Sequence, residues 1–299
     1  MVRAVRDYRW TVTQAGLRTV EALLPLGGLV FFLLASMAVF AARCATAGRP
    51  RTPYIEERAA SALWKWWMEW WVWLWGPVER ACIGLGISPN AITIASTALS
   101  VGAAALLAVG HLSLGGWTYL FAASLDLVDG RVARAQGSAT RSGAFLDSTL
   151  DRVAELAVFA GLAVHFRGDP ALYAALTASG ASVLVSYARA RGEGLGSERA
   201  ARVGGMQRAE RVVLTGVPCA LAPFFDALFA PHAGAVVVGG ALALLALVTA
   251  VTAARRSHSI WRSLRPATAT PDRAQPNVRW LDAARWRSRT GHGTGRPAR

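Results

Sequence analysis

Residues 125–151, LDLVDGRVARAQGSATRSGAFLDSTLD, place four aspartates inside a chain that is otherwise suited to a membrane. The four are Asp126, Asp129, Asp147 and Asp151. A charged side chain at the centre of a bilayer costs at least about 2.5 kcal/mol, so charged residues in apolar surroundings usually have a functional role. Because like charges repel at close range, four carboxylates in one short stretch need a shared partner.

The spacing of the aspartates suggests that this partner is a metal ion. Asp126 and Asp129 are three residues apart, and Asp147 and Asp151 are four apart. Both spacings place the two side chains of a pair on one face of an α-helix. Two such faces turned toward each other would form a cage of four carboxylates. Carboxylate oxygen is a hard ligand and the stretch contains no His or Cys, so the cage favours Mg²⁺ or Mn²⁺ over Zn²⁺.

Small residues and an arginine accompany the aspartates. Gly130 and Gly143 leave room for a backbone or a ligand to come close, and the small side chain of Ala133 leaves space on the same helix face. Arg134, one turn past Gly130, carries a forked guanidinium that can bind phosphate. A soluble helical hairpin whose charges face water is the alternative, but the apolar flanks and the regular spacing argue against it.

The same stretch resembles the signature of the CDP-alcohol phosphotransferase family, D-x-x-D-G-x-x-A-R-x8-G-x3-D-x3-D. Its fixed positions are met by Asp126, Asp129, Gly130, Ala133, Arg134, Gly143, Asp147 and Asp151. The resemblance extends over residues 88–256. It implies an enzyme of phospholipid biosynthesis that transfers a phosphatidyl group from CDP-diacylglycerol to the hydroxyl of a small alcohol and releases CMP.

The resemblance also implies roles for individual residues. The four aspartates would hold two divalent ions, Mg²⁺ or Mn²⁺, and Asp151 would act as the general base. The implied contacts to CDP-diacylglycerol are Pro89, Asn90, Ala91, Ile92, Gly130, Arg134 and Thr140. The first four belong to a Pro-Asn-x-x-Thr sequence at the start of the first core helix, for which a plain helix cap is the alternative.

Composition agrees with a membrane protein. The chain is 54% hydrophobic with a mean hydropathy of +0.34, which is typical of a protein with several membrane spans. Its net charge of +14 favours the anionic surface of a membrane as a partner, with nucleic acid as the less favoured alternative. The three cysteines, Cys44, Cys82 and Cys219, are far apart and indicate no disulfide framework.

Six apolar segments predict an all-α integral membrane protein with a six-helix core. They cover residues 91–112, 115–135, 142–165, 171–190, 210–229 and 233–254. The signature joins the second and third segments, so the aspartates should lie at one membrane surface. Arginines concentrate in the loops on that side, and the positive-inside rule makes it cytoplasmic. We therefore expect a multi-pass protein of the plasma membrane with its active site facing the cytoplasm.

Two regions precede the six-helix domain of residues 88–256. Residues 1–60 form an extension in which residues 22–42 are long enough to span about 30 Å of hydrocarbon. A signal peptide, or a kinked or re-entrant segment around Pro25, is the alternative. Residues 61–87 contain seven of the twelve tryptophans, with Lys65 and Glu69 on one face, and predict an amphipathic helix in the membrane interface. An ordinary span is the alternative there.

Residues 257–299 form a basic C-terminal tail. They contain few aliphatic side chains, so they cannot bury a core, and we expect a disordered cytoplasmic segment that is attracted to anionic lipid headgroups. Family members are often homodimers, which makes a second copy of the chain a further candidate partner.

A second group of polar residues flanks the fourth and fifth predicted spans. It consists of Ser186, Arg189, Arg191, Arg208 and Arg211. These arginines either anchor the span ends to lipid phosphate or form a pocket for an anionic acceptor. The sequence Ser-Tyr-x-(Lys or Arg)-Ala-Arg and the later Arg-x-Glu-Arg are similar to the bacterial phosphatidylinositol phosphate synthases, whose acceptor is inositol 1-phosphate. Arg189 stands where lysine is frequent, and residues 207–211 lack the usual proline, so glycerol 3-phosphate or another alcohol stays an alternative.

A membrane carrier or scaffold that uses the aspartates for ion passage is a different functional class. A carrier would be expected to distribute its charges along a path near the midplane of the bilayer. Here the aspartates cluster at one end of the helices, beside a phosphate-binding type of arginine, which favours the transferase.

Overall fold

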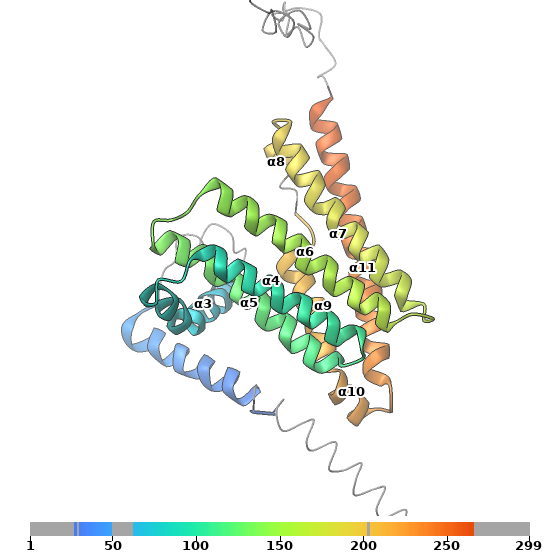
Figure 1. Ribbon diagram of the computed structural model, residues 1–299, viewed down its shortest axis with the longest axis horizontal. Coiled ribbons are helices and arrows are strands. Elements are labelled where there is room, and N and C mark those ends of the chain that lie inside the picture. The colour runs from blue at the N-terminus through green and yellow to red at the C-terminus, as the bar shows by residue number, and fades with distance from the viewer. Residues whose placement is uncertain (1–26, 29, 50–61, 202–203, 266–299) are drawn as a thin grey trace, which may run out of the picture. The chain divides into compact units, whose positions relative to one another are not determined.

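The computed structural model describes residues 27–28, 30–49, 62–201 and 204–265, and these residues form α-helices without any strand (Figure 1). A first helix covers Val30–Ala47. It is followed by α3 (Ala62–Gly84), α4 (Pro89–Ala108), α5 (Leu112–Ala135), α6 (Arg141–His165), α7 (Ala171–Gly194), α8 (Glu198–Ala201), α9 (Arg208–Ala220), α10 (Ala222–Leu228) and α11 (Ala233–Leu264). The all-α prediction is confirmed for this part of the chain.

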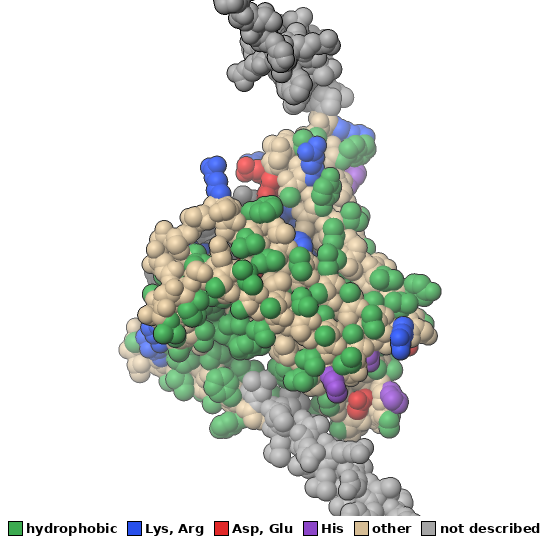
Figure 2. Space-filling view, in the orientation of Figure 1, with side chains coloured by type: hydrophobic (Ala, Val, Ile, Leu, Met, Phe, Trp, Pro, Cys, Tyr) green, Lys and Arg blue, Asp and Glu red, His purple; other side chains and the backbone are tan. Residues whose placement is uncertain are grey.

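Several of these helices are suited to a membrane. Within the described ranges, four are long and apolar enough to cross a bilayer, namely Val30–Ala47, α4, α7 and α11. Helices α9 and α10 would form a fifth span if the two together count as one. Helices α5 and α6 have 24 and 25 residues, which is also a spanning length, but they carry the charges of the signature. Figure 2 shows apolar side chains across much of the visible face, where charged side chains are sparse.

Local sequence determines where the helices that carry the site begin. Ser88 caps α4 by accepting a hydrogen bond from the Ala91 amide, and Pro89 occupies the first turn, where its missing N–H costs nothing. Thr140 caps α6 in the same way, with its hydroxyl 3.0 Å from the Gly143 amide nitrogen. The predicted start of the first core helix at Pro89 or Asn90 is confirmed.

Several predicted boundaries need correction. The helix of Val30–Ala47 continues five residues beyond the predicted end of the segment 22–42, while residues 22–26 lie outside the described residues. Helix α11 continues to Leu264, so the start of the predicted tail at residues 257–264 is helical, and residues 266–299 are not described. The predicted span 210–229 is bent by 45° between α9 and α10. Pro223 lies in the first turn of α10, where proline can begin a helix but cannot continue one from the preceding turn.

The core is built by close approaches between helices. Helix α4 packs against both α5 and α6, and α5 packs against α9. Glycines permit these contacts: a Cβ added at Gly161 of α6 would lie 2.3 Å from the Ala104 carbonyl oxygen, and one at Gly116 of α5 would lie 2.4 Å from the Ala220 amide nitrogen. Buried Leu107 and Leu162 fill the space beside them. The signature helices α5 and α6 are therefore held in fixed positions through α4 and α9.

The tryptophan-rich helix α3 packs against the preceding helix. Phe40 lies between Trp66 and Trp73, with ring centroids 5.6 Å from each, and the buried Trp70 indole donates to the Ser36 hydroxyl at 3.2 Å. Glu69, predicted to share one face of the helix with Lys65, is buried in an ion pair with Arg49. Part of the polar face of α3 is thus covered by protein, because Glu69 finds its counter-ion at the end of the neighbouring helix.

The approach of α6 to α4 predicts an asymmetry between two glycine substitutions. Gly161→Ala should lower the unfolding temperature by about 2–10 °C, because the added Cβ overlaps the backbone of α4 and overpacking costs about 1–3 kcal/mol. Gly102→Ala is the matched control, since nothing lies within 4 Å of its Cβ position and alanine favours a helix. Thermal unfolding in detergent measures both. Equal unfolding temperatures for the two variants would contradict this packing.

Candidate active site

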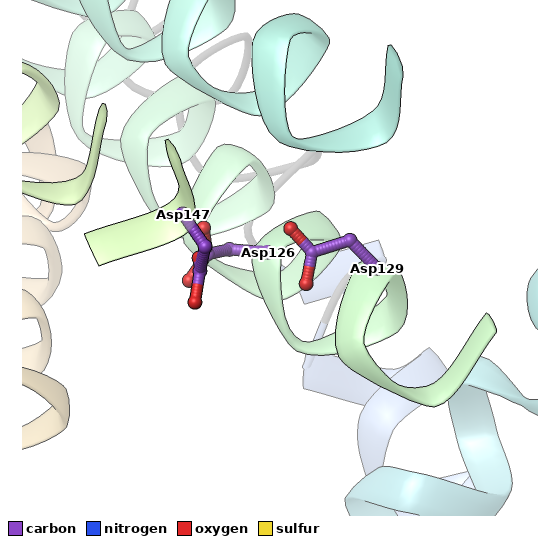
Figure 3. Close-up of side chains that lie close together, drawn as sticks. All are labelled: Asp126, Asp129 and Asp147. Atoms are coloured by element: carbon purple, nitrogen blue, oxygen red, sulfur yellow. The ribbon is translucent and has the colours of Figure 1, made fainter. Parts of the chain in front are cut away.

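Three of the four signature aspartates converge between α5 and α6. Asp126 and Asp129 come from α5 and Asp147 comes from α6. One oxygen of each lies within 4.8 Å of the others, and Figure 3 shows the three side chains close together, with the carboxylates of Asp126 and Asp147 side by side in this view. Asp129 is buried, with 5% of its surface exposed, while Asp126 and Asp147 are half-buried. The spacing of the signature therefore predicted the facing surfaces of the two helices correctly.

Helix α4 orients the buried member of this cluster. The Thr93 hydroxyl donates to Oδ2 of Asp129 at 2.5 Å, and the Gly130 amide donates to Oδ1 of the same carboxylate. Thr93 was not among the predicted site residues, although it is the threonine of the Pro-Asn-x-x-Thr sequence at the start of α4. Thr93 of this pattern thus orients the Asp129 carboxylate, whereas Pro89 and Asn90 form the start of α4.

Asp151, one turn along α6 from Asp147, reaches the cluster through an arginine. Arg208, in the first turn of α9, places Nη1 2.6 Å from Oδ1 of Asp151 and also donates from Nη1 to Oδ2 of Asp126. The predicted cage of four carboxylates is therefore seen as three carboxylates in close contact and a fourth joined to them by a guanidinium. This positive charge offsets part of the repulsion among the acids.

The donor set fits a divalent cation. Mg²⁺ binds oxygen at about 2.0–2.1 Å in an octahedral arrangement, so its ligands are separated by roughly 3–4 Å. The spacing of at most 4.8 Å among the three carboxylate oxygens needs only small side-chain rotations to reach that range. No nitrogen or sulfur ligand contributes to this group, which agrees with a hard ion such as Mg²⁺ or Mn²⁺.

Residues implied in nucleotide binding lie at the starts of α4 and α6 and on the turn of α5 that follows Asp129. A Cβ at Gly143 would lie 3.2 Å from the Thr140 hydroxyl oxygen and 3.5 Å from Oδ1 of Asn90. The Arg134 guanidinium lies over Gly130, where a Cβ would be 3.4 Å from Nη1. Asn90 at the start of α4 therefore lies close to Thr140 and Gly143 at the start of α6. Gly130 and Arg134 lie one turn apart on α5.

The remaining implied nucleotide contacts differ in exposure. Ala91 is exposed and Pro89 is half-buried in the first turn of α4. The Ile92 side chain is 6% exposed and packs with Val128 and Val132 of α5. Because the side chain of Ile92 belongs to this apolar cluster, a contact between this residue and a nucleotide would have to come from its backbone.

Arg211 lies in a buried ion pair, which sequence analysis did not foresee. Its Nε lies 2.6 Å from Oε1 of Glu155 and its Nη2 lies 3.1 Å from Oε2, and both side chains are 3% exposed. Nη1 of the same arginine donates to the Met206 carbonyl. The predicted role of Arg211 as an acceptor contact does not fit this geometry, because the side chain is buried and each of its three nitrogens already donates to Glu155 or Met206.

The other predicted acceptor residues divide between the cluster and the end of α7. Arg208 contacts the carboxylates directly, whereas Arg189 is exposed and pairs with Glu193 at 3.1 Å. Arg191 is exposed on α7, and the Ser186 hydroxyl donates to the Ser182 carbonyl. Arg256 of α11, which sequence analysis passed over, is buried and donates to the Val185 carbonyl, so it ties α11 to α7.

Comparison with known proteins agrees with this site. Residues 86–252 match the sequence model of the CDP-alcohol phosphatidyltransferase family. The match covers more than half of the chain and includes every signature residue. The chain belongs to the CDP-alcohol phosphatidyltransferase family, and it is accordingly a transferase and a multi-pass membrane protein.

The curated relatives point to one branch of the family. The chain is 37% identical over 194 residues to the phosphatidylinositol phosphate synthase of Mycobacterium tuberculosis, a match that covers 62% of this chain and 85% of the relative. It is 35% identical over 214 residues to the synthase of Mycolicibacterium smegmatis, with 67% and 92% covered.

Solved structures show the same likeness. The phosphatidylinositol phosphate synthase of Mycobacterium tuberculosis in complex with manganese and citrate has a TM-score of 0.55 at 31% identity, covering 67% of this chain and 92% of that chain. The structure of that enzyme with CDP-DAG bound has a TM-score of 0.54 and covers 67% and 98%.

The buried pair of Arg211 and Glu155 predicts a stability effect. Glu155→Gln should lower the unfolding temperature by roughly 10 °C, because an uncompensated buried arginine costs about 3–5 kcal/mol. Arg189→Gln is the control: it also breaks an ion pair, but an exposed one worth at most about 1 kcal/mol. Thermal unfolding of the two variants measures the difference. If Glu155→Gln unfolded at the wild-type temperature, the pair would have no structural role.

Proposed function

We propose that this protein transfers a phosphatidyl group from CDP-diacylglycerol to the hydroxyl of a small phosphorylated alcohol, with inositol 1-phosphate favoured, and releases CMP. The observation that carries the proposal is the carboxylate cluster of Asp126, Asp129 and Asp147 with Arg208 beside it. A cluster of acids with an adjacent arginine suits the handling of a diphosphate. The synthases that share the fold support the choice of acceptor.

Metal binding belongs to this proposal. Asp126, Asp129, Asp147 and Asp151 would hold two divalent ions, Mg²⁺ or Mn²⁺. Such ions would offset the negative charge of the donor diphosphate. The manganese in the structure of the Mycobacterium tuberculosis synthase supports the assignment.

The donor would lie with its head against α4, α5 and α6. Asn90 and Thr140, which lie beside Gly143, would contact the nucleotide, together with Pro89, Ala91 and the backbone of Ile92. Gly130 would let the nucleotide approach the backbone of α5, and Arg134 would bind a phosphate oxygen. The acyl chains of the donor would stay among the lipid tails, along the exposed apolar surface of the helices.

Asp151 would act as the general base. It would take the proton of the acceptor hydroxyl as that oxygen forms a bond to the phosphorus of the phosphatidyl group, while the bond between this phosphorus and the CMP oxygen breaks. Arg208, which contacts Asp151 and Asp126, would orient the base and bind the phosphate of the acceptor.

The acceptor pocket would be completed by Ser186, Arg189 and Arg191 from α7. Arg211 would support the pocket through Glu155 and hold α9, and with it Arg208, in place. Glycerol 3-phosphate or another alcohol is the alternative acceptor for the same chemistry. A carrier or scaffold is disfavoured, because the carboxylates cluster with an arginine at one place in the bundle.

We infer the placement in the membrane from the order of the helices and from the position of the carboxylates. Helices α4, α5, α6, α7, the bent pair α9–α10 and α11 would form the six core spans, with the active site on the cytoplasmic side of the plasma membrane. The helix Val30–Ala47 would add a span, and the tryptophan-rich helix α3 would lie in the interface. A homodimer is compatible with this arrangement.

Two aspartate variants should fail in different ways. Asp147→Asn should remove metal affinity and activity together, because it takes a charged ligand from the cluster. Asp151→Asn should lower kcat by roughly 10²-fold or more through loss of the base, and it should reduce metal affinity less than Asp147→Asn. Mn²⁺ titration and initial rates separate the two effects. Wild-type turnover of Asp151→Asn would remove this residue from the role of base.

The choice of acceptor is tested by CMP release. Purified protein in lipid is incubated with CDP-diacylglycerol, Mg²⁺ and one acceptor at a time. Release with inositol 1-phosphate, and little with glycerol 3-phosphate or free inositol, is the expected result. Release only with glycerol 3-phosphate would keep the transfer chemistry but contradict the acceptor assignment, and no release with any acceptor would contradict the function.

A further inference from the structure

The tryptophan-rich helix α3 is attached to the signature helix α5 by apolar contacts. The rings of Trp75 in α3 and Phe121 in α5 lie 5.6 Å apart. A buried apolar cluster of α4 and α5 residues, Ile92, Val128 and Val132, also contacts side chains of α3 and of the connection after it: Trp75, Cys82, Ile83 and Ile87. Helix α3 precedes residues 86–252, which the family shares. A helix that precedes the residues matched by the family model thus touches the helix that carries Asp126 and Asp129.

One ion pair joins the two helices next to the carboxylates. Arg131, two residues after Asp129, donates from Nε to Oε2 of Glu79 at 2.7 Å and donates to the same oxygen from Nη2. The Arg131 and Glu79 side chains are 25% and 18% exposed, so protein covers most of the pair. Two donors on one carboxylate oxygen restrict the guanidinium more than a single contact would.

The direction of this contact bears on the site. Successive residues of an α-helix are about 100° apart around the axis, so Arg131 projects from the side of α5 that lies opposite Asp129. Glu79 therefore does not compete for a cation in the carboxylate cluster. Glu79 binds the face of α5 opposite the one that carries Asp129. Rotation of α5 about its axis would therefore have to break the ion pair between Glu79 and Arg131.

A second polar contact acts at the end of α5. The Gln136 side chain donates to the Ile87 carbonyl at 3.2 Å, in the short connection between α3 and α4. On its other side, α3 is braced by the buried Trp70 indole, which donates to the Ser36 hydroxyl. Helix α3 is therefore fixed to its neighbours on both sides and can transmit restraint to α5.

We propose that Glu79 is a positioning residue for the metal-binding carboxylates and that it acts through Arg131. The inference rests on the proposed metal site and extends it to a helix that precedes residues 86–252. Loss of the Glu79 charge frees Arg131 and the C-terminal part of α5, so Asp126 and Asp129 lose their fixed orientation toward Asp147. Metal affinity falls while the ligands themselves remain present.

Mn²⁺ binding to the purified full chain in detergent tests this directly, with free Mn²⁺ measured by its electron paramagnetic resonance signal. Glu79→Gln is expected to raise the Kd for Mn²⁺ by roughly tenfold, the lower end of the range for residues that orient metal ligands. The matched control is Glu69→Gln, which breaks an ion pair in the same helix on the side away from α5 and should leave the Kd unchanged. Thermal unfolding is recorded for every variant.

A charge exchange separates positioning from simple support of the fold. Arg131→Glu alone should weaken Mn²⁺ binding, and the double variant Glu79→Arg with Arg131→Glu should recover much of the lost affinity by restoring the pair in reverse. A Glu79→Gln protein that binds Mn²⁺ as wild type does, whatever its unfolding temperature, would overturn the inference. So would a double variant no better than Arg131→Glu. Wild-type protein that binds no Mn²⁺ would overturn the metal site itself, a result distinct from either of these.

Discussion

The repulsion among carboxylates held within 4.8 Å of one another is the constraint on which the rest of the structure depends. Such a cluster is unfavourable in apolar surroundings unless cations and hydrogen-bond donors compensate it. The protein supplies Thr93 and the Gly130 amide to Asp129, and Arg208 to Asp126 and Asp151. A divalent ion would supply the remainder, so the stability of the site and its chemistry depend on the same interaction.

The helices around the cluster keep the acids together by packing that tolerates little movement. Helix α4 contacts both α5 and α6, and the approach at Gly161 leaves no space for a side chain. Helix α9 is fixed through Arg211 and Glu155, one turn from Arg208. Helix α3 holds the opposite side of α5 through Glu79. Ion pairs thus surround the site, and the most buried of them joins Arg211 of α9 to Glu155 of α6.

The parts that could be predicted from sequence depend on short-range spacing. The intervals between the aspartates specify helix faces, and the structure brings Asp126, Asp129 and Asp147 together. The helix start predicted at Pro89 or Asn90 is also found in the structure. The buried pair of Arg211 with Glu155, the Thr93 contact and the Glu79 contact join distant segments, and spacing along one helix does not encode them. The bend before α10 had a visible signal in Pro223, but hydropathy alone made the segment look continuous.

The central claim is that Asp126, Asp129 and Asp147 bind a divalent ion at the junction of α5 and α6. Anomalous diffraction at the manganese absorption edge, from crystals of the protein grown with Mn²⁺, tests it most directly. We expect an anomalous peak from a manganese ion within bonding distance of oxygens of all three aspartates, with Arg208 displaced from Asp126. Crystals that show no peak there, with Arg208 still bridging Asp126 and Asp151 at saturating Mn²⁺, would contradict it.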